Sequence, residues 1–232
     1  TSTNAMSLPS ITAASILART TNAAANLTIP VASVLTATGT GTPLTLVAGQ
    51  NFINNAGAGA LVLTGGGSPR WLVYSTNPAS DTIGSLSNNF RRFSCTYGGS
   101  CPTLGTGNGL LYSDTPTITV TPSAISNIVY GAATPSLTGY TYDAITSGQY
   151  LTAGDFAADM VTGSLNGITS YAPGAASGSV GTYNINYNAG TLSSALGYGF
   201  VYANNANAFS VTQRTVTASL TGTVSKVYDA TI

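Results

Sequence analysis

Few side chains in this sequence are suited to acid–base or nucleophilic chemistry. The 232-residue chain contains six Asp but no Glu and no His, together with five Arg, one Lys and two Cys. Without His, neither a Ser-His-Asp triad nor a Cys-His pair can form. A carboxylate pair for glycoside cleavage would have to come from the six Asp. We therefore expect no catalytic residues and no enzymatic activity.

Two of these aspartates, Asp155 and Asp159, are four residues apart and would share a face of a short helical turn over Ala153–Met160. The simpler interpretation is a helix start and a solvated side chain. A calcium site is the alternative, but hard cations prefer several oxygen ligands, and no dense Asp-Gly loop is present. The glycines follow no phosphate-binding pattern. The sequence predicts neither a metal nor a cofactor.

The two cysteines, Cys95 and Cys101, enclose a short loop that contains Gly98 and Gly99. Glycine lets such a loop turn tightly, and a disulfide suits a secreted chain. Free thiols are the alternative. A zinc site is not expected, because two thiols without His or further Cys supply too few ligands.

Aromatic and arginine side chains are the better candidates for binding a ligand. Sugars stack on exposed rings, and aromatic side chains often anchor interfaces. The candidates are Arg70, Trp71, Tyr74, Arg91, Arg92 and Tyr97. Trp71 could instead fill the core, and Arg91 and Arg92 could close a sheet edge through hydrogen bonds. The many tyrosines after residue 117 suit packing on a sheet.

The composition favours an all-β protein. Only 5% of residues are charged, against roughly 25% in ordinary globular proteins, while 43% are hydrophobic. Val, Ile, Thr and Tyr favour strands. The formal net charge is zero, and the six cations are scattered along the chain, so we expect no binding to nucleic acid, which requires a basic stripe. No apolar run is long enough to span a membrane. The first ten residues lack the features of a signal peptide, so we expect the export signal to lie elsewhere.

Residues 1–75 contain short apolar segments whose centres recur about every ten residues. Each is too short for a helix and is bounded by Gly, Asn, Thr or Pro. A sandwich and a β-solenoid both fit, and repetition at a short period favours the solenoid. The expected strands are Ser10–Ala18, Asn26–Thr28, Ser33–Ala37, Leu44–Ala48, Asn51–Asn54, Ala60–Thr64 and Arg70–Ser75.

Three further segments come after residues 1–75 and differ from them in pattern. Residues 76–116 are polar and aromatic and include the cysteine loop, which suits a cap over an open sheet edge. Residues 117–213 show regular turn signals between short strands, typical of a small β-sandwich-like module. Residues 214–232 begin another β module, with a strand expected over Arg214–Leu220.

The order of these segments resembles the late passenger region of filamentous-haemagglutinin-type adhesins, which are exported by two-partner secretion. Gly49–Ala58, Arg70–Pro78 and the Cys95–Cys101 loop carry that likeness. Residues 117–213 resemble an MBG domain of the YGX type. The start of a YDG domain is suggested by Thr215–Ala218 and Lys226–Asp229, although Ala230 stands where that family usually has Gly. The matching positions in residues 117–213 are Tyr130, Gly131, Pro135, Leu137–Gly139, Gly154, Asp155, Thr162–Leu165, Gly181–Tyr183 and Gly190–Leu192.

Pattern and resemblance together predict the end of a right-handed parallel β-helix with a cap, followed by a small β-sandwich-like module. The resemblance implies a secreted or cell-surface adhesin segment that binds glycans or matrix polysaccharide, with an outer-membrane partner during export. Self-association in a fibre, as a purely structural spacer, is one alternative. A polysaccharide-cleaving β-helix enzyme is another, disfavoured by the missing His and Glu.

Overall fold

The structure is a computed structural model in which strands make up almost all of the regular secondary structure. It describes the chain apart from residues 143–160, 203–207, 224, 226, 228, 229, 231 and 232. Within the described residues there is no α-helix, only a 3₁₀ turn at Ala176–Gly178. The prediction of an all-β chain is therefore confirmed. The described part also contains no helix long and apolar enough to cross a membrane.

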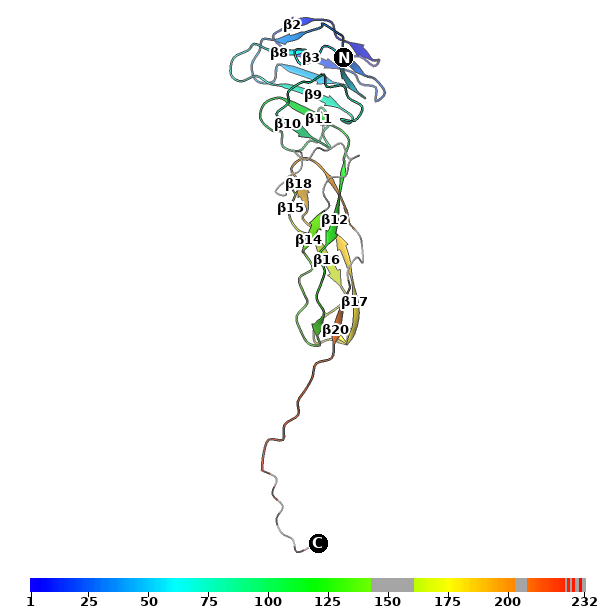
Figure 1. Ribbon diagram of the computed structural model, residues 1–232, viewed down its shortest axis with the longest axis vertical. Helices are drawn as coiled ribbons and strands as arrows, with labels where there is room; N and C mark the ends of the chain where they lie inside the picture. The colour runs from blue at the N-terminus through cyan, green and yellow to red at the C-terminus, as the bar shows by residue number, and fades with distance from the viewer. Residues whose placement is uncertain (143–160, 203–207, 224, 226, 228–229, 231–232) are drawn as a thin grey trace.

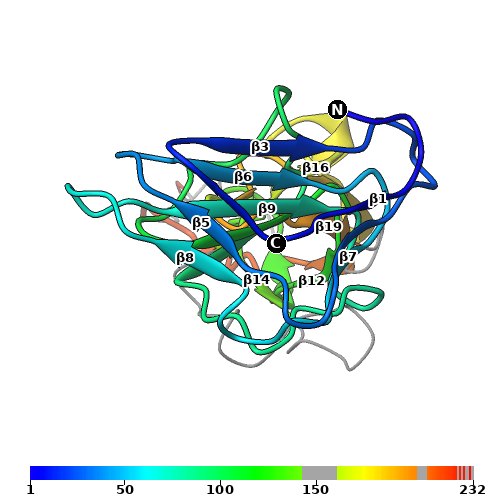
Figure 2. The same cartoon turned by 90° about the horizontal axis from the view of Figure 1, so that it is seen from above.

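The first 75 residues form three successive coils, each contributing one strand to each of three parallel sheets. Each strand pairs with the strand 21 to 28 residues further along the chain. Figure 2 looks down the long axis and shows the three sheets as sides around a common interior. The strands are β1 (Met6–Ser7), β4 (Leu27–Ile29) and β7 (Phe52–Asn54); β2 (Ile11–Ala13), β5 (Leu35–Ala37) and β8 (Leu61–Leu63); and β3 (Ile16–Arg19), β6 (Leu44–Val47) and β9 (Trp71–Ser75).

Apolar residues line the interior of the coils in columns. In β4, Leu27 and Ile29 are fully buried, while Thr28 between them is only partly so. The parallel register places Leu27 beside Phe52 and Leu44 beside Trp71. Because successive side chains on a strand point to opposite faces, this alternation directs one set of residues into the core. Three-residue strands suffice because each coil buries its apolar set against the next.

A glycine at a corner allows two coils to approach closely. A Cβ at Gly65 would lie 1.8 Å from the carbonyl oxygen of Gly39 in the preceding coil. Any side chain at that position would push the backbones apart. Small residues at the coil corners are therefore a packing requirement.

The segment expected to be a cap extends one sheet by two strands. β10 (Phe90–Arg92) and β11 (Gly109–Tyr112) join the third sheet, whose order is β10-β11-β9-β6-β3. β11 thus lies between β9 and β10, although β10 precedes it in the chain. The edge of β9 is therefore covered by strand pairing rather than by an irregular loop.

The same segment also covers the outer face of this sheet. Leu72, Phe90, Cys95 and Leu111 form a second apolar cluster, separate from the interior that buries Trp71. The Phe90 ring lies where a side chain at position 109 would stand, and glycine there leaves it room. The disulfide loop is thereby held against the outside of the coils.

The described residues between 117 and 212 form a second, narrower unit along the same long axis (Figure 1). Alternate residues of its two larger sheets, among them Ile118 and Phe209, are buried in the core. One sheet contains β14 (Tyr140–Tyr142), β12 (Thr117–Pro122) and β19 (Gly199–Tyr202); another contains β13 (Ile128–Val129), β20 (Ala208–Thr212), β17 (Gly181–Asn188) and β16 (Asn166–Thr169); and β15 (Val161–Thr162) pairs with β18 (Ser193–Ser194).

An aromatic cluster joins the two units. Phe93 is fully buried, and its ring centroid lies 5.4 Å from those of both Tyr112 and Tyr198. The Phe93 backbone N–H donates to the Leu196 carbonyl at 2.8 Å. Gly197 has a φ of +91°, and a Cβ there would lie 2.1 Å from the Phe93 carbonyl oxygen. The junction therefore depends on the packed Phe93 ring of the first unit and on the absence of a side chain at Gly197 of the second.

Two expectations concern the C-terminal half. The strand predicted over Arg214–Leu220 is wrong, since these residues form no strand in the structure. Val216 and Leu220 are 84% and 88% exposed, and none of the described strands lies alongside to complete a ladder, which a strand requires. The helical turn over Ala153–Met160, with Asp155 and Asp159, lies outside the described residues.

Asp81 ties the third coil to the segment that follows it. Its carboxylate accepts a hydrogen bond from the Phe52 backbone N–H at 2.8 Å and another from the Ser75 hydroxyl at 2.6 Å. Burial raises the pKa of Asp81 to about 6, although these two hydrogen bonds oppose the shift. The free-energy cost of removing the carboxylate charge from water thus exceeds the stabilisation that its two hydrogen bonds provide.

We predict that Asp81 makes the folded chain less stable as the pH rises from about 4 to about 6. In this window the folded state keeps the Asp81 proton and the unfolded state has lost it, so stability falls with pH and levels off above the folded pKa. Allowing for partial exposure, the change should be about 2 kcal/mol. Urea unfolding across this range should show the slope, and Asp81→Asn should remove it. An unaltered slope in the variant would contradict the assignment.

We also predict that Phe93→Ala weakens the junction and lowers the unfolding free energy by about 3 to 5 kcal/mol, the usual cost of deleting a buried ring. Fluorescence of the single tryptophan, Trp71, reports on the coils, and far-ultraviolet circular dichroism reports on both units. Val31→Ala, at a position 76% exposed, serves as a control and should change stability by less than about 0.5 kcal/mol. A loss below about 1 kcal/mol in Phe93→Ala would exclude a role for this ring in joining the units.

Candidate functional site

A row of side chains crosses the outer face of the third sheet. Parallel register places Arg19 of β3 beside Val47 of β6, Val47 beside Tyr74 of β9, and Tyr74 beside Leu111 of β11. Arg92 of β10 continues the row beyond Leu111. Residues 28 and 27 positions apart in sequence thus become neighbours across strands about 4.8 Å apart.

The disulfide loop places a tyrosine over this row. Cys95 and Cys101 are disulfide-bonded, and the loop between them is closed by a hydrogen bond from the Thr96 N–H to the Ser100 carbonyl at 3.0 Å. Tyr97 projects from the loop, and its ring meets that of Tyr74 edge-on with centroids 5.4 Å apart. The guanidinium carbon of Arg19 lies 5.3 Å from the centre of the Tyr97 ring.

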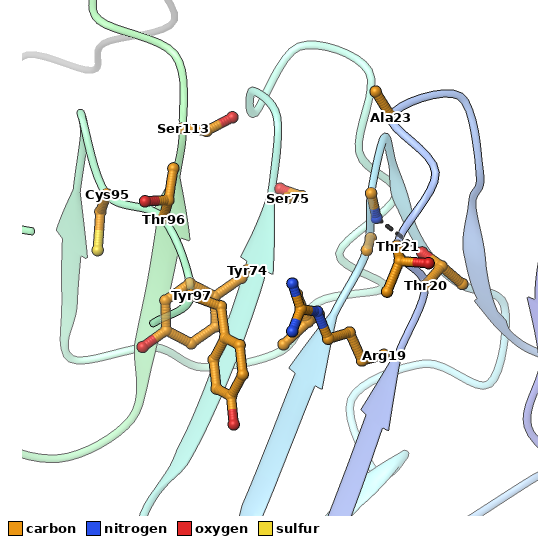
Figure 3. Close-up of a pocket in the computed structure, with 13 residues that line it drawn as sticks. Arg19, Thr20, Thr21, Ala23, Tyr74, Ser75, Cys95, Thr96, Tyr97 and Ser113 are labelled. Carbon is orange, nitrogen blue, oxygen red and sulfur yellow. Dashed lines mark hydrogen bonds between the residues drawn. The ribbon is translucent and has the colours of Figure 1, made fainter. Parts of the chain in front are cut away.

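These residues border a cavity of about 230 Å³ between the disulfide loop and the coils. Figure 3 shows Arg19 reaching from β3 towards Tyr74 and Tyr97. The strands supply one wall, the coil corner after β3 a second, and the disulfide loop a third. The lining residues are Arg19, Thr20, Thr21, Ala23, Val47, Ala48, Gly49, Tyr74, Ser75, Cys95, Thr96, Tyr97 and Ser113.

The polar groups of the coil corner are already bonded within the protein. The Thr20 hydroxyl donates to the Ala25 carbonyl at 3.0 Å and accepts from the Gly49 N–H at 2.7 Å. The Ser75 hydroxyl donates to Asp81. These bonds fix one wall of the cavity.

Tyr74 remains a hydrogen-bond donor at neutral pH. Burial raises the pKa of its hydroxyl, the neighbouring Tyr97 raises it further, and the charge of Arg70 opposes the shift. The phenol is therefore protonated at neutral pH.

The predicted ligand-binding residues do not form one site. Tyr74 and Tyr97 come together, whereas Trp71 is only 3% exposed and lies in the core. Arg70 donates to the Thr42 hydroxyl and the Gly105 carbonyl, both at 3.0 Å. These two side chains therefore hold the fold.

The paired arginines of β10 also lie away from the cavity. Arg92 donates to the Thr103 carbonyl at 2.7 Å and to the Arg91 carbonyl at 2.7 Å, and its guanidinium lies over the Phe90 ring. Arg91, half-buried on the same strand, is not among the lining residues. Arg92 thus secures the segment that carries the disulfide.

Sequence reasoning missed Arg19. It lies far from the aromatic cluster in the sequence, and only the coil period brings it beside Tyr74. Aligning the coils on their apolar columns would have revealed it, because Ile16, Leu44 and Trp71 share one column and Arg19, Val47 and Tyr74 lie three residues after them.

The tyrosines of the second unit serve mainly in packing and turns. The Tyr171 hydroxyl donates to the Ala132 carbonyl at 2.6 Å, and that of Tyr183 to the Ser179 carbonyl at 2.7 Å. Both rings contact Phe209. Among the residues that the structure describes, no three His, Cys, Asp or Glu side chains gather as metal ligands.

No family model matches the chain, and comparisons with curated proteins and with solved structures also found no match.

We predict that breaking the disulfide loosens the loop that carries Tyr97. Closing a loop of this length contributes about 2 kcal/mol by restricting the unfolded chain, so reduction should lower the free energy of unfolding by that amount. The chain has only these two cysteines, so the effect of a reductant can be assigned to them. A Cys95→Ser, Cys101→Ser double variant should match the reduced protein and be insensitive to reductant. Equal stability of the oxidised and reduced proteins would contradict this role.

Proposed function

We propose that this chain is a segment of an extracellular bacterial adhesin that attaches to surfaces or other cells by binding glycans, without catalysis. In this proposal residues 1–116 are the end of a right-handed parallel β-helix with its cap. Residues 117–213 are a β-sandwich-like MBG module, and residues 214–232 open a YDG module. The proposal includes secretion to the cell surface through an outer-membrane partner of the two-partner type.

The observation that carries the proposal is the arrangement along one axis. Coils with stacked apolar columns lead directly into a second β unit through the Phe93 junction (Figure 1). Such an elongated chain carries a surface away from its point of attachment, and a cavity of about 230 Å³ lies on the outside of its coils. That cavity is lined by phenol rings, hydroxyls and a guanidinium, the groups that contact sugars through ring faces and hydrogen bonds.

The chemical inventory favours binding over turnover. The whole chain lacks His and Glu, and the cavity lining contains no carboxylate to act as a general acid or base. A cavity of about 230 Å³ is below the usual range of about 300 to 1,000 Å³ for pockets that enclose a ligand. It suits one sugar unit of a longer chain.

The same geometry favours one further candidate, a structural stalk that extends or packs into fibres. Its support is the stack of coils, which requires no ligand to explain it. Under this alternative the cavity is a by-product of folding the disulfide loop onto the sheet.

We predict that the purified chain binds particular structures on an array of host and bacterial glycans and that Tyr97→Ala weakens this binding at least tenfold. Tyr97 is chosen because it sits on a surface loop at the cavity, whereas Trp71 is in the core and its loss would disturb the fold. Tyr130→Ala is a matched control, since Tyr130 is 43% exposed in the second unit, and it should leave binding unchanged.

Each outcome has a distinct meaning. Binding lost in Tyr130→Ala but kept in Tyr97→Ala would move the site to the second unit. A chain that binds nothing on the array, yet sediments as a concentration-dependent polymer, would replace the adhesin with the stalk.

A further inference from the structure

The Arg19 guanidinium is held by an aromatic ring rather than by a hydrogen bond at its Nε. Its Nε is buried without a hydrogen-bond partner among the described residues. The contact that fixes the group is the Tyr97 ring, with the guanidinium carbon 5.3 Å from the ring centre. A guanidinium has five N–H donors, and burying an unsatisfied donor costs free energy. An acceptor oxygen of a ligand in the cavity would satisfy this donor.

The surroundings of Arg19 leave its charge uncompensated. None of the thirteen residues lining the cavity is acidic. Asp81, which bonds the Ser75 hydroxyl, accepts its other hydrogen bond from Phe52. Arg19 is half-buried, and a cation that is partly withdrawn from water attracts an anion more strongly than a fully solvated one does.

The remaining lining matches a sugar ring. Tyr74 contributes an aromatic ring, and Thr96 and Ser113 contribute hydroxyls, whereas the Thr21 hydroxyl donates to the Ser2 carbonyl at 3.3 Å. Tyr97 of the disulfide loop and Val47 of the strand face also line the cavity. A ring that bears hydroxyls and one carboxylate would meet donors, an apolar wall and a cation together.

We propose that this cavity binds an acidic monosaccharide unit through its carboxylate, with Arg19 as the bidentate donor and Tyr97 covering the ring. The inference deepens the proposed glycan-binding function and rests on it. A planar carboxylate matches the fork of N–H groups on a guanidinium, and the Tyr97 ring holds that fork in place. Hexuronic acids of matrix polysaccharides and sialic acids of host surfaces share this chemistry.

The test measures binding of the intact chain to glucuronate and N-acetylneuraminate trisaccharides and to their neutral counterparts, by calorimetry and by chemical-shift changes in side-chain arginine signals. The acidic sugars should bind at least tenfold more tightly than the neutral ones and should shift one arginine signal. Whichever acidic sugar binds better identifies matrix or host as the source.

Three variants assign the preference to Arg19. Arg19→Gln should abolish the preference for acidic sugars, and Arg19→Lys should retain part of it, since an ammonium keeps the charge but loses the planar fork. Arg214→Gln, at an exposed arginine outside this cavity, is the matched control and should behave as the parent chain. The urea midpoint of Arg19→Gln should be unchanged or raised, because the variant removes a buried donor that the fold leaves unpaired.

The outcomes separate this inference from the function on which it rests. Neutral sugars that bind as well as acidic ones, with loss in Tyr97→Ala, would overturn the carboxylate site and leave the adhesin in place. Equal binding of sulfated neutral sugars would show a general anion site and overturn the carboxylate assignment. Absence of binding to every sugar would overturn both. A lowered midpoint in Arg19→Gln with an unchanged acid preference would make Arg19 a structural residue.

Discussion

The in-register pairing of short parallel strands is the constraint on which the rest of this structure depends. Each strand of the coils holds only a few residues, so no strand is stable without the equivalent strand of the next coil. A shift of one residue would move every apolar side chain of a strand to the outer face. Register therefore fixes the interior columns and, with the same precision, the outer row of Arg19, Val47 and Tyr74. The candidate site is a direct consequence of core packing.

The order of strands at the end of the stack turns this outer row into a cavity. Because β11 inserts between β9 and β10, the chain must return from the edge to the middle of the sheet. The residues between these strands cross the outer face, where the disulfide and the cluster around Leu72 and Phe90 hold them. Tyr97 is thereby placed above Tyr74, and Phe93, at the start of the return, reaches the second unit.

The sequence allowed prediction of the parts that depend on local pattern. The alternating segments Leu44–Ala48 and Ala60–Thr64 contain β6 and β8, and Tyr74 and Tyr97 are predicted as ligand candidates because they are aromatic residues near the expected cap. Arg19 was not predicted because only the pairing of successive coils brings it to the row that contains Tyr74. The number of residues between paired strands varies from coil to coil, so this alignment is not obvious in the sequence. The strand expected at Arg214–Leu220 failed for the converse reason, because alternation shows what a segment can form but not whether a partner strand is beside it.

Two ionisable side chains, Asp81 after the third coil and Arg19 on the first, differ in whether the protein supplies their hydrogen-bond partners. Asp81 loses hydration but receives donors from Ser75 and Phe52, so the protein itself satisfies the carboxylate and links two segments through it. Arg19 also has buried polar surface, yet its Nε meets no acceptor among the described residues. A structural arginine would be expected to resemble Arg70 and Arg92, each of which donates to a carbonyl oxygen. A neutral side chain of similar length could pack on Tyr97 without the free-energy cost of an unpaired buried donor. The Arg19 guanidinium is therefore better explained by an acceptor oxygen supplied from outside the chain.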